Sequence, residues 1–357
     1  MPAKSAEIMA LEIQQQPEVC SRLLTREEPG LLKLVAKLRA KRPAGILLAA
    51  RGSSDHAAVY GRYLLEHLTG IPTSLAAPSL VTLYKAKPRM KDYVVIGVSQ
   101  SGQGPDINAV VKLASSQGAM TIGITNDPKS GLAKASRYLL NLGAEKEQAV
   151  AATKTFTAEL AALALLGVLW NQDRELVRHL WNIPHQMKQV LHETRRPVEA
   201  LAKKMRSLHA CVVIGRGYQM GIAHEMGLKM KECAGVPALS YSIADFAHGP
   251  ISLAKAGFPV FLLSAPGVLA QEAFDATLDL LRRGAKVVRV GLQDPNFAKH
   301  KPSPRLDLSL SSKQACPELL APLLTILPGQ WFAYYNALAK GMNPAMPKGL
   351  KKVTKTK

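Results

Sequence analysis

Short, continuous apolar runs recur along the chain, and glycine or serine directly follows most of them. In the first half they lie at 45–50, 93–98, 120–124 and 138–142, and helix-like segments separate them. Continuous apolar runs of strand length indicate strands that are buried on both faces, as in parallel sheets. The pattern therefore predicts a doubly wound α/β sheet with helices on both sides.

The same rhythm starts again in the second half of the chain. Apolar runs lie at 210–215, 259–263, 286–290 and 306–310, and the first of them ends in Arg216-Gly217, as the first run of the chain ends in Arg51-Gly52. The 357 residues are also too many for one ordinary core. We therefore expect two tandem doubly wound parallel-sheet domains.

The remaining segments have other patterns. The first forty residues carry apolar positions at helical spacing, and 160–170 is an apolar stretch about half as long as the ~20 residues of a membrane span, so we expect N-terminal helices and a buried helix. Residues 171–205 indicate linking helices with breaks at Pro184 and Pro197. The expected divisions are N-terminal helices 1–43, first domain 44–170, linking helices 171–206, second domain 207–340 and an irregular basic tail 341–357.

The formal net charge of +20 is open to three interpretations. A basic chain attracts nucleic acid, but the cations are scattered and no helix-turn-helix or zinc-finger spacing occurs, so we expect no nucleic-acid partner. A positive field would also concentrate anionic sugar phosphates. The third interpretation is a basic solvated surface. Only the tail concentrates the charge, with Lys348, Lys351, Lys352, Lys355 and Lys357.

The four cysteines are far apart in the sequence and form no CxxC pair. This spacing argues against a disulfide framework or a structural zinc site and is typical of a reducing compartment. The N-terminus has no apolar stretch of the signal-peptide kind, so the sequence predicts a cytoplasmic protein without a membrane partner.

Two predicted strands of the first half end in hydroxyl-rich turns. Ser53 and Ser54 follow the first strand, and Ser99-Gln100-Ser101-Gly102 follows the second. Ligands of doubly wound sheets bind beyond the carboxyl ends of the strands, where helix N-termini favour phosphate. The alternative is that these serines only cap helices. Two such turns in one domain favour an anion site.

Other site signatures are missing. No GxGxxG follows a strand, no P-loop lysine motif or HExxH occurs, and the nine histidines form no ligand-like cluster, so we expect neither a metal nor a cofactor. Taken alone, 228–232 is a charged helical stretch of the kind that usually faces solvent, and 248–250 is an ordinary turn.

Together, however, these segments resemble a known family. In order they are 12–17, 51–54, 99–102, 150–157, 225–232, 248–250 and 350–354. The chain is similar over nearly its whole length to the isomerase part of glucosamine-6-phosphate synthase and to the stand-alone type II glucosamine-6-phosphate deaminases. Both consist of sugar isomerase (SIS) domains.

The resemblance implies a role for each matching residue. Glu232 corresponds to the base that moves a proton between C1 and C2, and Lys229 to a lysine that supports it. His248 corresponds to the ring-opening residue, which in the family reaches the site from the neighbouring subunit of a homodimer. Lys352 corresponds to a tail lysine that forms a Schiff base with the open-chain ketose. The implied sugar-phosphate contacts are Gly52, Ser53, Ser54, Ser99, Gln100, Ser101, Val150 and Ala152.

The chain departs from the synthase pattern at several positions. Gly104-Pro105 stands where the synthase has a phosphate-binding threonine, although Pro105 is compatible with the first turn of a helix. Ala152 replaces a serine, and 242–248 differs before the histidine. The sequence also contains no glutaminase domain and no cysteine at position 2, so we do not expect glutamine as a nitrogen source.

The resemblance therefore implies an amino-sugar-phosphate enzyme that works toward ammonia release. We expect isomerisation and deamination of a hexosamine 6-phosphate, glucosamine 6-phosphate first, to the ketose 6-phosphate and ammonia. The alternatives are a deglycase for fructosyl-amino-acid phosphates, a galactosamine-6-phosphate deaminase, and a non-catalytic sugar-phosphate sensor.

Overall fold

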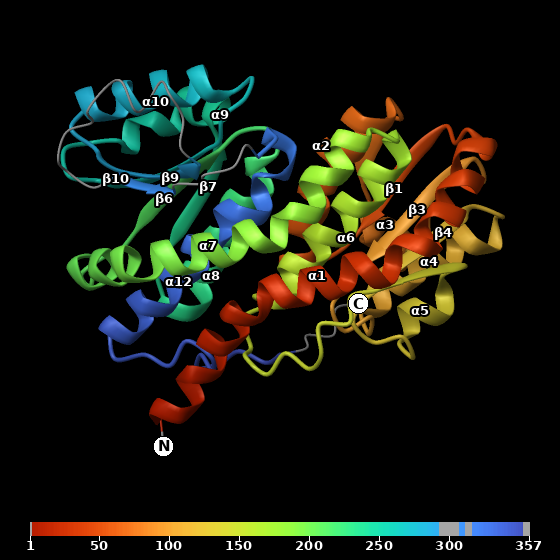
Figure 1. Cartoon of the computed structure of the whole chain (residues 1–357), viewed down its shortest axis with the longest axis horizontal. Coiled ribbons are helices and arrows are strands. Elements are labelled where there is room, and N and C mark those ends of the chain that lie inside the picture. Colours follow the sequence, from red (N-terminus) through yellow and green to blue (C-terminus); the bar gives the residue numbers. More distant parts are fainter. Residues whose placement is uncertain (1, 293–306, 311–315, 353–357) are drawn as a thin grey trace. The chain divides into compact units, whose positions relative to one another are not determined.

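The computed structural model describes residues 2–292, 307–310 and 316–352, with the backbone alone for 2–5 and 307–310. These residues form two compact units, each with a five-stranded sheet whose strands are all parallel (Figure 1). Of the described residues, the β1 unit comprises 18–147, 154–181 and 351–352, and the β6 unit comprises 2–17, 148–153, 182–292, 307–310 and 316–350. The predicted α/β fold with two parallel sheets is confirmed.

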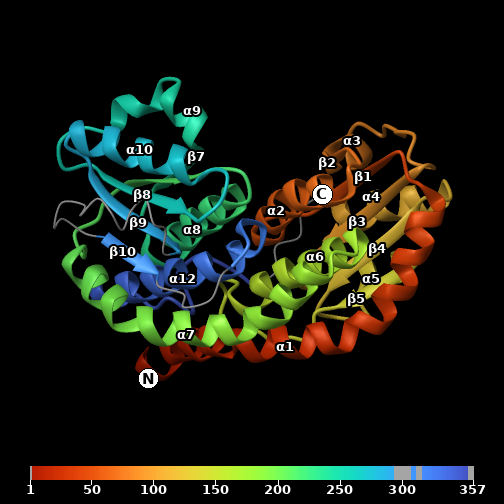
Figure 2. The same cartoon turned by 45° about the horizontal axis from the view of Figure 1, so that its top comes forward.

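The β1 unit has the strand order β2-β1-β3-β4-β5. Helices α2 and α6 pack together on one face of the sheet, and α4 and α5 lie on the other (Figures 1 and 2). The elements are β1 (Gly45–Ala49), α2 (Ser53–Thr69), β2 (Thr73–Leu75), α3 (Pro78–Thr82), β3 (Tyr93–Val98), α4 (Pro105–Ser116), β4 (Met120–Thr125), α5 (Gly131–Ala135), β5 (Tyr138–Asn141) and α6 (Lys154–Asn171).

Burial explains why the strands of this sheet are continuous apolar runs in the sequence. All six residues of β4 are buried, and five of the six in β3 are buried. One cluster of buried side chains joins β1 and β3 to α4 and α5, and it includes Val95, Ile107, Val111 and Leu132. Because the sheet is covered on both faces, its strands cannot alternate apolar with polar residues.

The β6 unit has the strand order β10-β9-β8-β6-β7. Helices α8 and α12 pack against each other on one face, whereas α9 and α10 lie on the other (Figure 2). The elements are β6 (Cys211–Gly215), α8 (Gln219–Ala234), β7 (Ala238–Ser242), α9 (Ile243–Ala247), the 3₁₀ helix η1 (Pro250–Leu253), β8 (Pro259–Ser264), α10 (Ala270–Arg282), β9 (Lys286–Leu292), β10 (Asp307–Leu310), the 3₁₀ helix η2 (Glu318–Leu320) and α12 (Pro322–Ala339).

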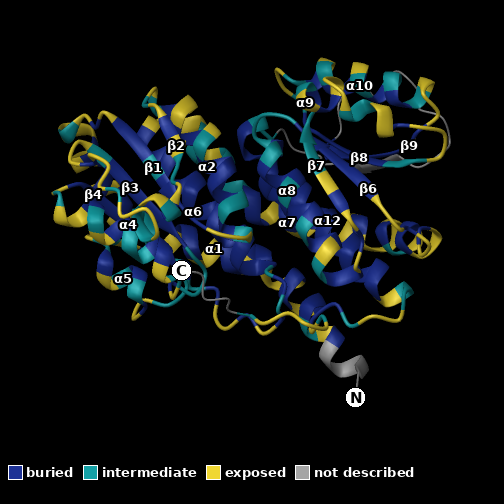
Figure 3. Ribbon diagram, turned by 180° about the vertical axis from the view of Figure 1, so that it is seen from behind, coloured by how far each residue is buried: buried dark blue, intermediate teal, exposed yellow. Residues whose placement is uncertain are grey.

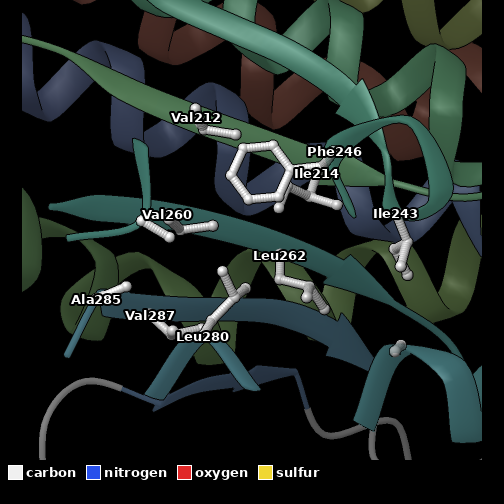
Figure 4. Close-up of a cluster of buried hydrophobic side chains, with 11 residues drawn as sticks. Val212, Ile214, Ile243, Phe246, Val260, Leu262, Leu280, Ala285 and Val287 are labelled. Carbon is white, nitrogen blue, oxygen red and sulfur yellow. The ribbon is translucent and has the colours of Figure 1, made fainter. Parts of the chain in front are cut away.

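One hydrophobic cluster of the β6 unit lies between its sheet and helices α9 and α10. Figure 4 shows Val212 and Ile214 of β6 and Val260 and Leu262 of β8 beside Phe246 of α9, and all of these side chains are buried. Leu280 of α10 and Val287 of β9 complete the layer. Aliphatic side chains dominate, as the low aromatic content of 5% requires.

Two long helices have residues in both units: α1 (Pro2–Lys41) and α7 (Arg174–Lys204). The predicted breaks at Pro184 and Pro197 are wrong, because both prolines lie inside the single helix α7. A proline removes one backbone hydrogen bond, but α7 is strongly amphipathic, and its buried residues include Ile183 and Val198. This packing compensates for the lost bonds.

The other expected segments have mixed outcomes. The apolar stretch 160–170 is a buried part of α6, as predicted, and α6 appears dark blue in Figure 3. Residues 341–352 are irregular, as predicted, whereas 353–357 and residue 306 of the predicted last strand lie outside the described residues. In the described part of the chain, no helix is both long enough and apolar enough to cross a membrane.

All four cysteines are free thiols, in agreement with their spacing. Cys20, Cys211 and Cys233 are buried, and burial raises the pKa of each thiol to about 12. Cys20 belongs to the β1 unit, and the other two belong to the β6 unit.

Candidate active site

The two serine-bearing turns of the β1 unit lie at neighbouring strand ends. β1 pairs in parallel with β3 from Gly45–Tyr93 to Ala49–Gly97, so the turns that follow them emerge at the same sheet edge. β1 also stands where the strand order reverses, between β2 and β3. Such a switch point is the usual ligand site of a doubly wound sheet. The predicted proximity of Ser53 and Ser54 to Ser99–Ser101 therefore follows from the strand pairing.

Two glycines allow these turns to form. Gly52 precedes α2 with φ 59° and ψ −133°, and Gly102 has φ 61°. A Cβ at Gly102 would lie 2.2 Å from the Ser130 hydroxyl oxygen, so a side chain is excluded by space as well as by backbone conformation. At Gly52 a Cβ would meet nothing within 4 Å, so only the positive φ favours glycine there.

The serines do not cap the helices that follow them. The N-cap residues of α2 and α4 are Gly52 and Gly104, and neither helix start has a side-chain cap within the described structure. Ser99 Oγ instead accepts a hydrogen bond from Gly102 N at 3.1 Å, and Ser101 Oγ accepts one from Gln103 N at 3.3 Å. Capping of α2 or α4 therefore does not explain these serines, and Ser99 and Ser101 instead bond to backbone N–H groups within their own turn.

Ser54 makes a contact that the sequence did not indicate. Its hydroxyl donates to Glu159 Oε1 of α6 at 2.7 Å, and both residues are buried. This bond orients the first turn of α2 against α6.

Lys352, the expected Schiff-base lysine, is paired with a buried carboxylate in the β1 unit. Its Nζ lies 2.6 Å from Glu147 Oε2, and its side chain is 25% exposed, whereas that of Glu147 is fully buried. Glu147 also accepts hydrogen bonds from the Thr155 backbone N at 3.2 Å and from the Thr155 hydroxyl at 2.6 Å. Sequence reasoning missed Glu147, because it stands in a charged segment of the kind that usually faces solvent.

Three charged side chains of α8 form the second candidate cluster, in the β6 unit. Lys229 is fully buried, and its Nζ lies 2.5 Å from Glu232 Oε2 and 3.3 Å from Glu225 Oε1. The spacings of three and four residues place all three on one face of the helix. Glu225 is fully buried, but Glu232 is 24% exposed, so the expected base is the member of the cluster that a ligand can reach.

The two carboxylates determine the charge of Lys229. Burial alone would lower the pKa of this ammonium, but the attraction of Glu225 and Glu232 outweighs burial and raises the pKa above its ordinary value. Lys229 therefore remains a cation that orients the Glu232 carboxylate, in keeping with the supporting role that the resemblance implies.

Replacing Lys229 with Met should destabilise the fold by about 3–5 kcal/mol, because two carboxylates would lose their buried counter-charge. Urea unfolding measures the change. Lys231→Met is the matched control, since Lys231 is exposed on the same helix, and we expect a change within about 0.5 kcal/mol. Equal stability of the two variants would contradict the importance of this cluster.

The unmodified protein and Lys229→Met can also be compared as a function of pH. Because the pKa of Lys229 is raised in the folded state, its contribution is complete below the ordinary value of 10.5 and is lost as pH rises through the folded-state value. The stability difference between the unmodified protein and Lys229→Met should therefore be constant from neutral pH to about pH 9 and should shrink only above about pH 10.5.

Val150 and Ala152 lie in a segment of the β6 unit that is firmly anchored. Both are half-buried, whereas the alternating residues Ala149 and Ala151 are buried. The Glu12 carboxylate accepts from the backbone N of residues 148 and 149 at 2.5 and 3.2 Å. Val150 N donates to Ala345 O at 2.9 Å. The two bonds to the Glu12 carboxylate give a structural reason for the acidic residue of the 12–17 motif.

His248 directly follows α9 as its C-cap residue and is exposed. Its backbone N bonds to Ala244 O and Asp245 O, and its ring makes no hydrogen bond within the described residues. The structure does not bring it into the cluster of Lys229 and Glu232. No group of His, Cys, Asp or Glu in the described part of the chain could hold a metal ion.

Comparison with known proteins defines the class. The sequence profile of the SIS domain family matches residues 39–169 and 204–326, and the chain belongs to this family, with two SIS domains in tandem. Each match contains one of the two sheets' switch-point strands, β1 or β6.

Particular relatives are longer than this chain. The chain is 34% identical over 321 residues to glutamine–fructose-6-phosphate aminotransferase (isomerizing) of Gloeobacter violaceus. The match covers 86% of this chain and 51% of that protein. The same enzyme of Aquifex aeolicus is 32% identical with the same coverage. The chain thus spans about half the length of these curated relatives.

Solved structures of similar length share the fold. A putative phosphosugar isomerase from Silicibacter pomeroyi superposes with a TM-score of 0.83 and 30% identity, over 94% of this chain and 99% of that one. Glucosamine-6-phosphate deaminase from Thermotoga maritima superposes with a TM-score of 0.73 over 95% of this chain and 100% of that one. At 22% identity the latter likeness concerns the fold alone.

Proposed function

We propose that this chain is a phosphosugar isomerase that isomerises and deaminates a hexosamine 6-phosphate, converting glucosamine 6-phosphate and water to fructose 6-phosphate and ammonia. The observation that carries the proposal is the cluster on α8, in which a partly exposed carboxylate, Glu232, is held by the buried cation Lys229. A carboxylate that can reach a ligand while a neighbouring cation fixes its position suits the transfer of a proton between two carbons.

The relatives support the substrate class. The aminotransferases act, by their name, on fructose 6-phosphate with isomerisation, and the similar structure of 30% identity is named as a phosphosugar isomerase. The deaminase that shares the fold over its whole length contains no additional portion beyond the match. Release of ammonia is the part of our proposal that goes beyond the substrate class.

Each proposed role corresponds to a property of the residue. The turns with Ser53, Ser54 and Ser99–Ser101 hold the phosphate, and Val150 with Ala152 contacts the sugar. Glu232 moves the proton between C1 and C2, and His248 opens the ring.

Lys352 condenses with the ketose carbonyl. For this step the lysine amine must first lose its proton. Glu147, 2.6 Å from Lys352 Nζ, is placed to accept that proton.

The direct test is incubation of the pure protein with glucosamine 6-phosphate and measurement of both ammonia and fructose 6-phosphate. We expect the two products in equal amounts. A folded protein that releases no ammonia above the blank would refute deamination. A panel with galactosamine 6-phosphate and a fructosyl-amino-acid phosphate then separates the sibling activities, and a thermal shift by sugar phosphate without turnover on any substrate would indicate a sensor.

We further propose a homodimer in which His248 of the partner subunit serves each site. Its exposure at the end of α9, outside the Lys229–Glu232 cluster, favours this arrangement. Inactive Glu232→Gln and His248→Ala proteins should regain activity when they are unfolded and refolded together, because one site of the mixed dimer then has both residues. Each protein refolded alone is the control. A mixture that stays inactive, although mixed dimers form, would contradict sharing.

A further inference from the structure

Arg51 connects the two serine-bearing turns. It is the second residue after β1, and its Nε lies 3.0 Å from Oδ2 of Asp106, the second residue of α4. The Arg51 side chain is 49% exposed, whereas that of Asp106 is 1% exposed. The guanidinium therefore extends from the turn after β1 to the helix start that follows the turn after β3.

Four N–H donors of Arg51 remain available. A guanidinium has five donors, and the Nε donor is bonded to Asp106. Within the described residues the Arg51 side chain has no other hydrogen bond or ion pair. Because the side chain is half-exposed, the donors on the two Nη atoms are accessible to a ligand.

The start of α4 itself offers few donors to an anion. Pro105 has no N–H, and the N–H of Ile107 is already bonded to Asp106 Oδ1 at 2.9 Å. Gly104 has no side chain that could supply a hydroxyl. A helix N-terminus binds phosphate through its unpaired N–H groups, so this one is depleted.

The carboxylates beside the serine turns also make a nearby cation necessary for phosphate binding. Asp106 and Asp55 both lie at helix starts beside the serine turns, and the charge of Arg51 acts on Asp55 as well as on Asp106. Without a cation these two carboxylates would repel a phosphate dianion. Arg51 is the cation that the structure places between the two turns.

We propose that Arg51 is a phosphate-binding residue of this chain, and that its two Nη groups bind the phosphate in a bidentate manner. It supplies the donors that the α4 start and Gly104 lack, while Asp106 fixes the plane of the guanidinium. Planar guanidinium groups match the spacing of phosphate oxygens, so such a contact gives both affinity and orientation. The inference rests on the proposed function only in that the ligand carries a phosphate.

The test is calorimetric binding of glucosamine 6-phosphate and, separately, of inorganic phosphate. Arg51→Gln should weaken both by about 10- to 100-fold, as expected for loss of charge-assisted hydrogen bonds. The affinities of Arg51→Lys should lie between those of the unmodified protein and Arg51→Gln. Lysine keeps the positive charge but lacks the planar guanidinium that can bind two phosphate oxygens at once. Arg62→Gln is the matched control, since it removes the same charge from α2 in the same unit and should leave both affinities unchanged.

A double variant separates binding from structure. Arg51→Gln alone leaves the buried Asp106 without its partner and should lower the melting temperature. Arg51→Gln combined with Asp106→Asn removes both charges and should recover much of that stability. If the double variant still binds phosphate about 10-fold or more weakly than the unmodified protein, Arg51 contacts the ligand. Recovery of full affinity would overturn the proposal, because Arg51 would then act only through Asp106.

Two further outcomes are equally decisive. Weaker binding of glucosamine 6-phosphate with unchanged binding of inorganic phosphate would place Arg51 on the sugar and overturn the proposal. An unmodified protein that binds neither ligand would also overturn it. Because the readout is binding, a protein that binds both ligands but releases no ammonia would refute only the proposed deamination.

Discussion

In a Glu232→Gln variant we expect turnover of glucosamine 6-phosphate to fall by at least about 100-fold, with little change in the affinity for the substrate. The amide has the size of the carboxylate and can still accept a hydrogen bond from Lys229, but it cannot take a proton from carbon. Lys229 keeps Glu225 as a counter-ion, so the fold should persist. Steady-state kinetics and calorimetry measure the two effects separately.

The control for this variant is Glu199→Gln. Glu199 lies in α7 of the same unit and pairs with the exposed Lys203 at 2.7 Å, so its loss removes the same charge without touching the α8 cluster. We expect unchanged kcat and KM. A fully active Glu232→Gln protein would eliminate Glu232 as the base, whereas equal losses in both variants would point to a general charge effect.

The second large effect is expected for Lys352→Met. The unmodified protein, incubated with fructose 6-phosphate and borohydride, should gain the mass of one reduced sugar phosphate per chain, because a Schiff base is reduced to a stable secondary amine. The variant should lose this adduct, and its turnover should fall by at least about 100-fold, because methionine has no amine that could condense with the ketose carbonyl.

Lys351→Met is the matched control, because Lys351 is adjacent in the sequence and exposed. The sequence did not decide by itself which of these two lysines faces inward, and the resemblance selected Lys352. In the structure Lys352 pairs with a buried carboxylate, whereas Lys351 is exposed. An adduct that persists in Lys352→Met and disappears in Lys351→Met would reverse this assignment.

Much of the fold was predictable because burial on both faces produces an unambiguous pattern. The run at 93–98 became β3 without any change of bounds, and the run at 45–50 became β1 with one residue fewer. The strands that sequence reasoning missed are β2 and β7. Both lie at sheet edges, and only the first residue of each is buried, so neither forms a continuous apolar run.

The site was less predictable because its contacts join distant residues. Glu147 and Lys352 are 205 positions apart, and Arg51 and Asp106 are 55 apart. No local pattern marks such pairs, since each residue alone is typical of a solvated surface. The α8 cluster was also ordinary as a sequence, because spacings of three and four residues are common in exposed helices. Only burial distinguishes it.

The reactivity of the buried cysteines can report on local unfolding of this protein. A thiol whose pKa is about 12 is almost entirely protonated at neutral pH, and a protonated thiol reacts slowly with alkylating reagents. Modification must therefore wait for a fluctuation that exposes the sulfur. Mass spectrometry that distinguishes Cys20 from Cys211 and Cys233 would yield separate opening rates for the two units, without any introduced label.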